Sequence, residues 1–153
     1  MIFVSHRESE QQIAMLLVEF LLAAIDIDDD AIRCTSVPGH QLPFGETIGS
    51  RLKADIHASS GVYTILTPES LTSKWVLFEL GASWGFGKMV VPILGQGLRP
   101  ADLPGPLSAY PCVQIDASDA AARLLDSTSQ LAQQLGLHQK AGGKAQESPR
   151  EGV

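Results

Sequence analysis

The chain has 153 residues, of which 44% are apolar and 18% charged, and its formal net charge is −6 with a pI near 5.1. This length corresponds to about one domain, and the composition excludes disorder, collagen and coiled coil as overall classes. Because the chain is acidic and has no basic stripe, direct contact with nucleic acid or an anionic membrane is a poor expectation.

The sequence carries no sign of targeting to a membrane or for secretion. The longest nearly apolar stretch, residues 13–25, contains Glu19 and is too short to cross a bilayer. The first residues lack the basic flank of a secretory signal. Cys34 and Cys112 lie far apart, which predicts reduced, buried thiols. We therefore expect a cytoplasmic protein.

The first helix is strongly patterned. Apolar residues recur at helical spacing from Ile13 to Ile25, which predicts an amphipathic helix of about four turns. Ser9 and Gln12, three residues apart, predict a capping box at its start. A short apolar run at residues 2–5 precedes it and predicts a strand.

Further strands and helices follow in alternation. Strands are predicted at residues 31–35, 61–66, 89–94 and 111–115, and helices at residues 46–57, 73–88 and 118–137. Segments rich in proline and glycine, residues 36–45 and 95–106, predict shaped loops. Strands that alternate with helices predict an α/β fold with a parallel sheet covered on both faces.

Ligands of such sheets bind beyond the carboxyl ends of the strands, and several kinds of site can be excluded there. A phospho-receiver domain needs an aspartate where the third strand is followed by Thr67. Gly85 and Gly87 lie late in a predicted helix and indicate its end rather than a phosphate-binding loop. The four histidines are scattered, and neither C-x-x-C nor G-x-S-x-G occurs, so we expect no metal site and no serine hydrolase.

One pair of residues in the helix at 73–88 stands out. Trp75 and Glu79 are four residues apart and therefore share a helix face. An indole beside a carboxylate can stack a flat heterocycle and hydrogen-bond ribose hydroxyls. On spacing alone, a core tryptophan and a solvated glutamate would be the ordinary interpretation.

Three segments resemble the conserved boxes of the bacterial Toll/interleukin-1 receptor (TIR) domain. They are Ile-Phe-Val-Ser-His at residues 2–6, the pair of segments at 33–39 and 42–45, and the Trp-x-x-x-Glu-Leu-Gly segment at 75–81. The resemblance covers roughly residues 1–137, in the family's order and spacing.

This resemblance implies a three-layer, flavodoxin-like fold. The family has a five-stranded parallel sheet of order 2-1-3-4-5 with helices on both faces, which agrees with the pattern of predicted elements. We therefore expect a TIR domain at residues 1–138 and a disordered tail at residues 139–153.

Many bacterial and plant TIR domains cleave the nicotinamide–ribose bond of NAD+, and some cyclise the product. The resemblance thus implies an NAD+ nucleosidase, a glycohydrolase or ADP-ribose cyclase that self-association activates, in bacterial immune signalling such as antiviral defence. Glu79 matches the catalytic glutamate and Trp75 the aromatic residue one turn before it. Ser5, His6 and Arg7 lie where members contact the dinucleotide, although His6 stands at a position that is commonly aromatic.

The implied chemistry needs one carboxylate. The nicotinamide of NAD+ is already a cationic leaving group, so the second carboxyl of ordinary glycosidases is not required, and NAD+ would be a substrate rather than a bound cofactor. Glu79 would orient the ribose hydroxyls and stabilise the oxocarbenium-like transition state. Arg7 would pair with the pyrophosphate, or it is solvated beside Glu8 and Glu10; the sequence leaves both open.

The loop at residues 36–45 matches the family's segment that borders the pocket and mediates self-association into filaments. Its residues that match are Pro38, Gly39, Leu42, Phe44 and Gly45. Expected partners are NAD+, other TIR domains and a sensor chain or domain. Two alternatives stay open: a non-catalytic TIR–TIR adaptor module, and a sensor subunit that binds a nucleotide without cleaving it.

Four other residues are assigned structural roles. Arg33 and Asp55 are expected to be surface or ion-pair residues. Trp84 and Phe86 are expected to pack against the sheet.

Overall fold

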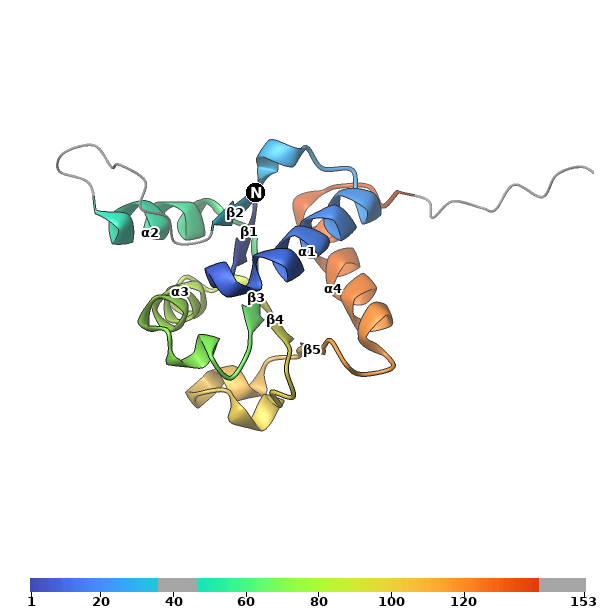
Figure 1. Cartoon of the computed structure of the whole chain (residues 1–153). Helices are drawn as coiled ribbons and strands as arrows, with labels where there is room; N and C mark the ends of the chain where they lie inside the picture. Colours follow the sequence, from blue (N-terminus) through green and yellow to red (C-terminus); the bar gives the residue numbers. More distant parts are fainter. Residues whose placement is uncertain (36–46, 141–153) are drawn as a thin grey trace, which may run out of the picture.

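A five-stranded parallel sheet in the order β2-β1-β3-β4-β5 forms the centre of the molecule, with α-helices on both faces (Figure 1). The computed structural model describes residues 1–35 and 47–140. The strands are β1 (Ile2–Ser5), β2 (Ile32–Thr35), β3 (Gly61–Leu66), β4 (Met89–Leu94) and β5 (Val113–Gln114). The α-helices are α1 (Gln11–Ala24), α2 (Ile48–Ala58), α3 (Lys74–Gly85) and α4 (Ala120–Leu135). The predicted fold class and strand order are confirmed.

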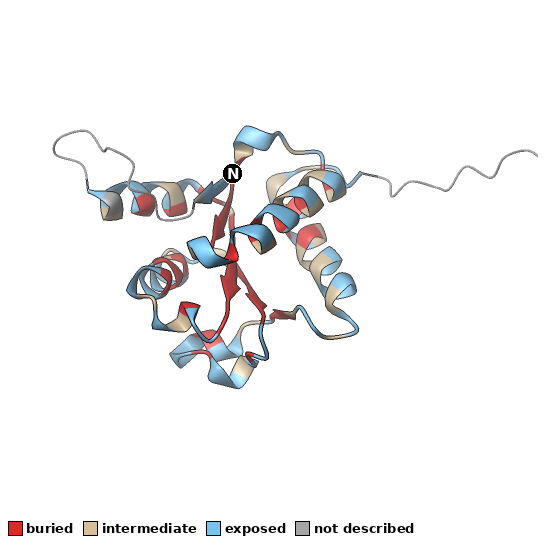
Figure 2. Ribbon diagram, viewed as in Figure 1, coloured by how far each residue is buried: buried red, intermediate tan, exposed pale blue. Residues whose placement is uncertain are grey.

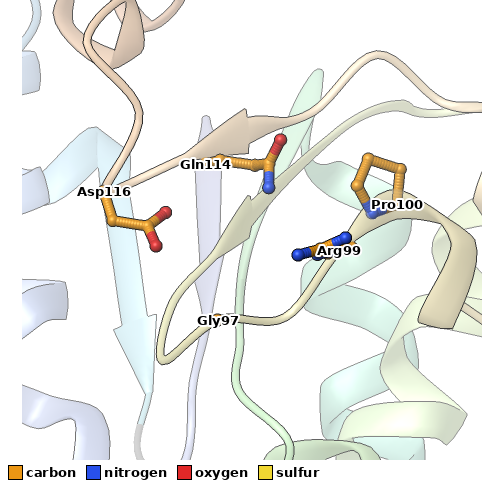
Figure 3. A pocket seen from close by; sticks show the side chains of 5 residues that line it. All are labelled: Gly97, Arg99, Pro100, Gln114 and Asp116. Atoms are coloured by element: carbon orange, nitrogen blue, oxygen red, sulfur yellow. The ribbon is translucent and has the colours of Figure 1, made fainter.

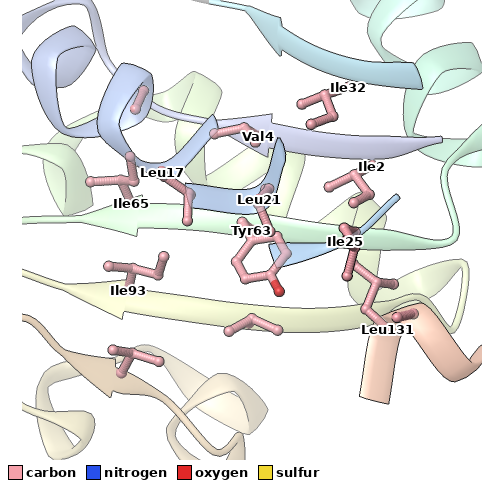
Figure 4. Packing of buried hydrophobic residues seen from close by; sticks show 14 residues of the cluster. Ile2, Val4, Leu17, Leu21, Ile25, Ile32, Tyr63, Ile65, Ile93 and Leu131 are labelled. Atoms are coloured by element: carbon pink, nitrogen blue, oxygen red, sulfur yellow. The ribbon is translucent and has the colours of Figure 1, made fainter. Parts of the chain in front are cut away.

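The largest hydrophobic core lies between the sheet and the helices α1 and α4 (Figure 4). Side chains alternate between the faces of a strand, so that Val4 of β1 and Tyr63 of β3 point to this side. The helical residues of this core are Ala14, Leu17, Leu21, Leu131 and Ala132. A Cβ at Gly61 would lie 2.5 Å from Leu131 Cδ1. Glycine at the start of β3 therefore allows α4 to approach the sheet closely.

The helices α2 and α3 cover the opposite face. Phe3 and Val62 pack against α2, while Leu66 and Leu94 pack on the side of α3. The helical residues in these two cores are Leu52 and Ile56 of α2, and Val76 and Leu80 of α3. Because both faces are covered, β1 and β3 are buried along their whole length (Figure 2).

The segment between β4 and β5 is more structured than the predicted loop at 95–106. It contains two short 3₁₀ helices, η4 (Pro100–Asp102) and η5 (Gly105–Ala109). Three leucines of this segment, Leu98, Leu103 and Leu107, are buried in the core on the α3 side of the sheet. The following strand is shorter than predicted, because only Val113 and Gln114 pair with β4.

The capping box predicted for the first helix is wrong. A 3₁₀ helix, η1 (Glu8–Glu10), precedes α1, and the Glu10 carboxylate accepts the backbone N–H of Arg7 at 3.1 Å. Glu10 is only 4% exposed, so a buried acid rather than Ser9 organises this turn.

The structural assignments outside the site are confirmed in part. Arg33 Nε lies 3.7 Å from Asp55 Oδ2, and Phe86 packs on the α2 core as predicted. Trp84 is 52% exposed, so its predicted packing against the sheet is wrong. Helix α3 ends at Gly85 rather than at the predicted residue 88. Just after this end, Gly87 takes a positive φ of 64°, which glycine adopts readily.

Both cysteines are free thiols, one at each edge of the sheet. Cys34 in β2 is exposed, which corrects the prediction that it is buried. Cys112, just before β5, is buried as predicted.

Two residues just past the predicted boundary at residue 138 pair with the end of α1. Gln139 forms an antiparallel bridge with Ile25, and the Lys140 N–H donates to the Ala24 carbonyl at 2.9 Å. The rest of the predicted tail, residues 141–153, and the loop residues Pro38, Gly39, Leu42, Phe44 and Gly45 lie outside the described residues. Within residues 1–35 and 47–140, no helix combines the length and hydropathy needed to span a membrane.

Candidate functional site

Glu79 is buried in the middle of α3, against the end of β1. Its side chain is 2% exposed, and its Oε2 accepts a hydrogen bond from Oγ of Ser5, the last residue of β1. Ser83 Oγ donates to the Glu79 carbonyl at 2.7 Å. Ser73 is the N-cap of this helix, and its Oγ accepts the Val76 N–H at 3.5 Å. The structure therefore brings together two predicted site residues, Ser5 and Glu79, at the carboxyl edge of the sheet.

Burial changes the acidity of this carboxyl. Loss of solvation raises the pKa of Glu79 from 4.5 to about 7, while the hydrogen bond from Ser5 acts in the opposite direction. Both forms of the carboxyl are therefore populated near neutral pH. A buried carboxyl with a raised pKa and one specific partner is typical of functional sites, although structural networks also produce it.

Thr64 places a further hydroxyl near this pair. It is the register partner of Ser5 across β1 and β3, and it is fully buried. Register partners in a parallel sheet point to the same face, so the Thr64 side chain points toward the α3 side. Among the residues that the structure describes, Thr64 Oγ1 has no hydrogen-bond partner. Sequence analysis gave no signal for this residue.

Trp75 lies one turn before Glu79 on α3, as predicted, and its ring contacts Phe78. The indole packs edge-to-face against Phe78, with ring centroids 6.3 Å apart and an angle of 83° between the planes. It is 38% exposed, whereas Glu79 is buried. A ring that is partly exposed beside a buried carboxylate can still present a surface for stacking.

His6 contacts β2 rather than Glu79. It is 3% exposed, and its Nδ1 lies 3.8 Å from Cys34 Sγ. Burial lowers the pKa of His6, with smaller opposing effects from the Val4 backbone and the charge of Glu10. The lowered pKa favours the neutral imidazole, which is unsuited to pairing with a phosphate as a cation.

Arg7 forms an ion pair that sequence analysis did not predict. Its Nη1 lies 2.8 Å from Glu69 Oε1 and donates to the Glu69 carbonyl at 3.1 Å. Glu10 fixes the same region, because its Oε1 accepts from Thr67 Oγ1 at 2.6 Å. The segments that follow β1 and β3 are therefore tied together. Only the rule that neighbouring parallel strands end side by side could have indicated Thr67 and Glu69.

One hollow among the described residues is not lined by Glu79. Its volume is about 410 Å³, and it lies beside the carboxyl ends of β4 and β5 (Figure 3). Its lining residues are Gly97, Arg99, Pro100, Gln114 and Asp116. None of the predicted site residues line it. In the described residues, no group of three or more His, Cys, Asp or Glu side chains could hold a metal ion.

Comparison with known proteins finds the same fold in TIR-containing receptors. No family model matches the chain. The uncharacterized protein YddK of Bacillus subtilis (strain 168) is 32% identical over 83 residues, which cover 54% of this chain and 31% of YddK. The metazoan TIR-STING receptor from C. gigas has a TM-score of 0.59, with 23% identity in its complex with 2',3'-cGAMP and 22% in a second structure. The match covers 84% of this chain in both cases.

The chain thus spans about a third of the length of YddK and about two fifths of the receptor chains, as 31%, 39% and 40% coverage show. At this level of identity the likeness concerns the fold alone. The chain has a TIR-like fold, a five-stranded parallel sheet of order 2-1-3-4-5 with helices on both faces.

Proposed function

We propose that this chain is a TIR domain that acts as an NAD+ nucleosidase, a hydrolase of the nicotinamide–ribose bond. One observation carries the proposal: a buried glutamate, Glu79, with its pKa raised to about 7, accepts a hydrogen bond from Ser5 at the carboxyl edge of a TIR-like fold. The Trp-x-x-x-Glu spacing and the residues of β1 support it. Bacterial immune signalling in the cytoplasm is the proposed setting.

The reaction proposed for this site breaks one bond. The N-glycosidic electron pair leaves with nicotinamide, which becomes neutral, and positive charge develops on the ribose. The ionised Glu79 carboxylate would stabilise that charge, since a fixed charge in a buried site acts more strongly than in water. Ser5 would hold Oε2 and so orient the carboxylate. A water molecule would then add to the sugar and release one proton to solvent. In a cyclase, a nitrogen of the adenine would add instead.

Trp75 and Arg7 would bind the two ends of the substrate. Trp75 is partly exposed one turn from Glu79 and would stack the nicotinamide ring. Arg7 would bind the pyrophosphate, for which a guanidinium is well suited. We propose no bound cofactor. Self-association through residues 36–45, with Phe44 as the apolar contact, would be required for activity.

A non-catalytic interaction module is the second candidate. It is favoured by the surface of α3, where large apolar side chains are exposed: Trp75, Leu77, Phe78 and Trp84. Exposed apolar patches of this kind mark interaction sites in many proteins. A partner that covers α3 is compatible with an adaptor. It is equally compatible with an enzyme that is active only when assembled.

A fluorescent NAD+ analogue separates these functions. The nucleosidase predicts release of nicotinamide, at a rate that rises more steeply than linearly with protein concentration because assembly is required. Binding without turnover would instead identify a nucleotide sensor. Neither binding nor turnover, across all protein concentrations, would identify an adaptor and reject the proposal.

A further inference from the structure

The ion pair between Arg7 and Glu69 occupies the place where strand order reverses. In a sheet of order 2-1-3-4-5, the connection that leaves β1 leads to β2 on one side, and the connection that leaves β3 leads to β4 on the other side. Ligands of such sheets bind in the crevice between the carboxyl ends of these two strands. Arg7 follows β1, and Glu69 follows β3. Ser5, which donates to Glu79, lies two residues before Arg7. The guanidinium is therefore on the same edge of the sheet as the buried carboxyl.

The guanidinium of Arg7 is already engaged. Its Nη1 meets both the carboxylate of Glu69, at 2.8 Å, and the Glu69 carbonyl, at 3.1 Å. A carboxylate and a phosphate offer a guanidinium the same kind of acceptor oxygen. A phosphate group that approaches Arg7 must therefore displace the carboxylate or share the cation with it.

We propose that Glu69 is an internal competitor for the phosphate group that Arg7 binds, so that it sets the affinity of this edge for compounds that contain pyrophosphate. This inference rests on the proposed function, because it deepens the role of Arg7 at the same site. Glu69 therefore helps to determine specificity for compounds that contain pyrophosphate. It touches Arg7, and its effect on substrate is exerted through Arg7.

Exposure determines how large the competition is. The Arg7 side chain is 32% exposed and that of Glu69 is 62% exposed. Exposed ion pairs are weak, so loss of Glu69 should tighten phosphate binding by only about two- to fivefold. The same exposure lets the Glu69 side chain move into solvent when an anion arrives. The effect should diminish at high salt, because solvent screens exposed charges.

Neighbouring acids serve other purposes and supply the control. Glu10 is buried with both oxygens bonded, Oε1 to Thr67 and Oε2 to the Arg7 N–H, so it holds the loops. Glu8 is exposed and, among the described residues, forms no ion pair with Arg7. Glu8→Gln therefore changes the net charge as Glu69→Gln does, without touching the guanidinium.

The test measures binding of inorganic pyrophosphate to the full chain by calorimetry. Pyrophosphate has no glycosidic bond, so the readout is independent of NAD+ cleavage. Glu69→Gln should lower the dissociation constant about two- to fivefold relative to Glu8→Gln, and the difference should disappear in an Arg7→Gln background. Equal constants for Glu69→Gln and Glu8→Gln, a difference that persists without Arg7, or no binding by any variant would overturn the inference.

The two proposals can fail separately. If wild type cleaves NAD+, Glu69→Gln should lower KM more than it changes kcat. If wild type does not cleave NAD+ while Glu69→Gln still tightens pyrophosphate binding through Arg7, the nucleosidase proposal fails and the competition stands. If wild type cleaves NAD+ and Glu69→Gln changes neither the pyrophosphate affinity nor KM, the competition fails and the nucleosidase proposal stands.

Discussion

The stability of the Glu79→Gln variant relative to wild type should increase as the pH rises. The folded state holds the carboxyl proton more tightly than the unfolded state, because burial raises the pKa of Glu79 from 4.5 to about 7. Between these values, the folded protein binds more protons than the unfolded chain. Stability from this group is therefore lost as pH rises through that interval, and the loss is complete above about pH 7.

The magnitude follows from the two pKa values. Their difference corresponds to about 3 kcal/mol of unfolding free energy, and no discount for solvent is needed because Glu79 is 2% exposed. Glutamine keeps the acceptor for Ser5 and cannot ionise. The unfolding free energy of Glu79→Gln minus that of wild type should thus increase by about 3 kcal/mol from about pH 4 to pH 8.

The assay is denaturant unfolding of both proteins at several pH values. Burial lowers the pKa of His6, which gives its contribution the opposite dependence on pH, but His6 is present in both proteins and cancels in the difference. Glu19→Gln, on the exposed side of α1, is the matched control for loss of a helical glutamate charge. A difference between wild type and Glu79→Gln that does not vary with pH would refute the reasoning from burial.

Three further outcomes test the fold. Thr64→Val should raise the unfolding free energy by about 1 kcal/mol, because it removes a buried hydroxyl that has no partner among the described residues; a loss of stability would show that the hydroxyl is bonded. A thiol reagent should modify Cys34 in the native protein and Cys112 only on unfolding, since only Cys34 is exposed; equal rates would contradict this. Truncation after Lys140 should leave the melting temperature nearly unchanged, whereas truncation after His138 should cost about 1 kcal/mol through loss of the bond to α1. Identical melting curves for the two truncations would place the end of the fold at residue 138.

The sheet was predictable where local sequence decides the structure. β3 and β4 have the predicted bounds, because each is a short run of mainly apolar residues rich in β-branched side chains. The segment between β4 and β5 was harder to predict. Its prolines and glycines indicate a loop, and the burial of Leu103 and Leu107 depends on packing against α3. Short 3₁₀ helices have no periodicity that a sequence of this length reveals.

The candidate site was predictable in its residues but not in its contacts. The spacing of Trp75 and Glu79 and the resemblance pointed to α3, yet the burial that raises the pKa of Glu79 comes from the whole fold. Arg7 and Glu69 are 62 residues apart, so their pairing is a product of topology. Glutamates beside Arg7 in sequence were the obvious partners, and the structure selects a distant one.

The central claim is that the Glu79 carboxylate promotes cleavage of NAD+. The most direct measurement is nicotinamide release by folded Glu79→Gln at saturating NAD+ and pH 8, where most of the wild-type carboxyl is ionised. We expect the rate to fall by about 10²–10³ relative to wild type, the usual cost of one preorganised electrostatic group, with Glu19→Gln close to wild type. Turnover by Glu79→Gln near the wild-type rate would contradict the catalytic assignment.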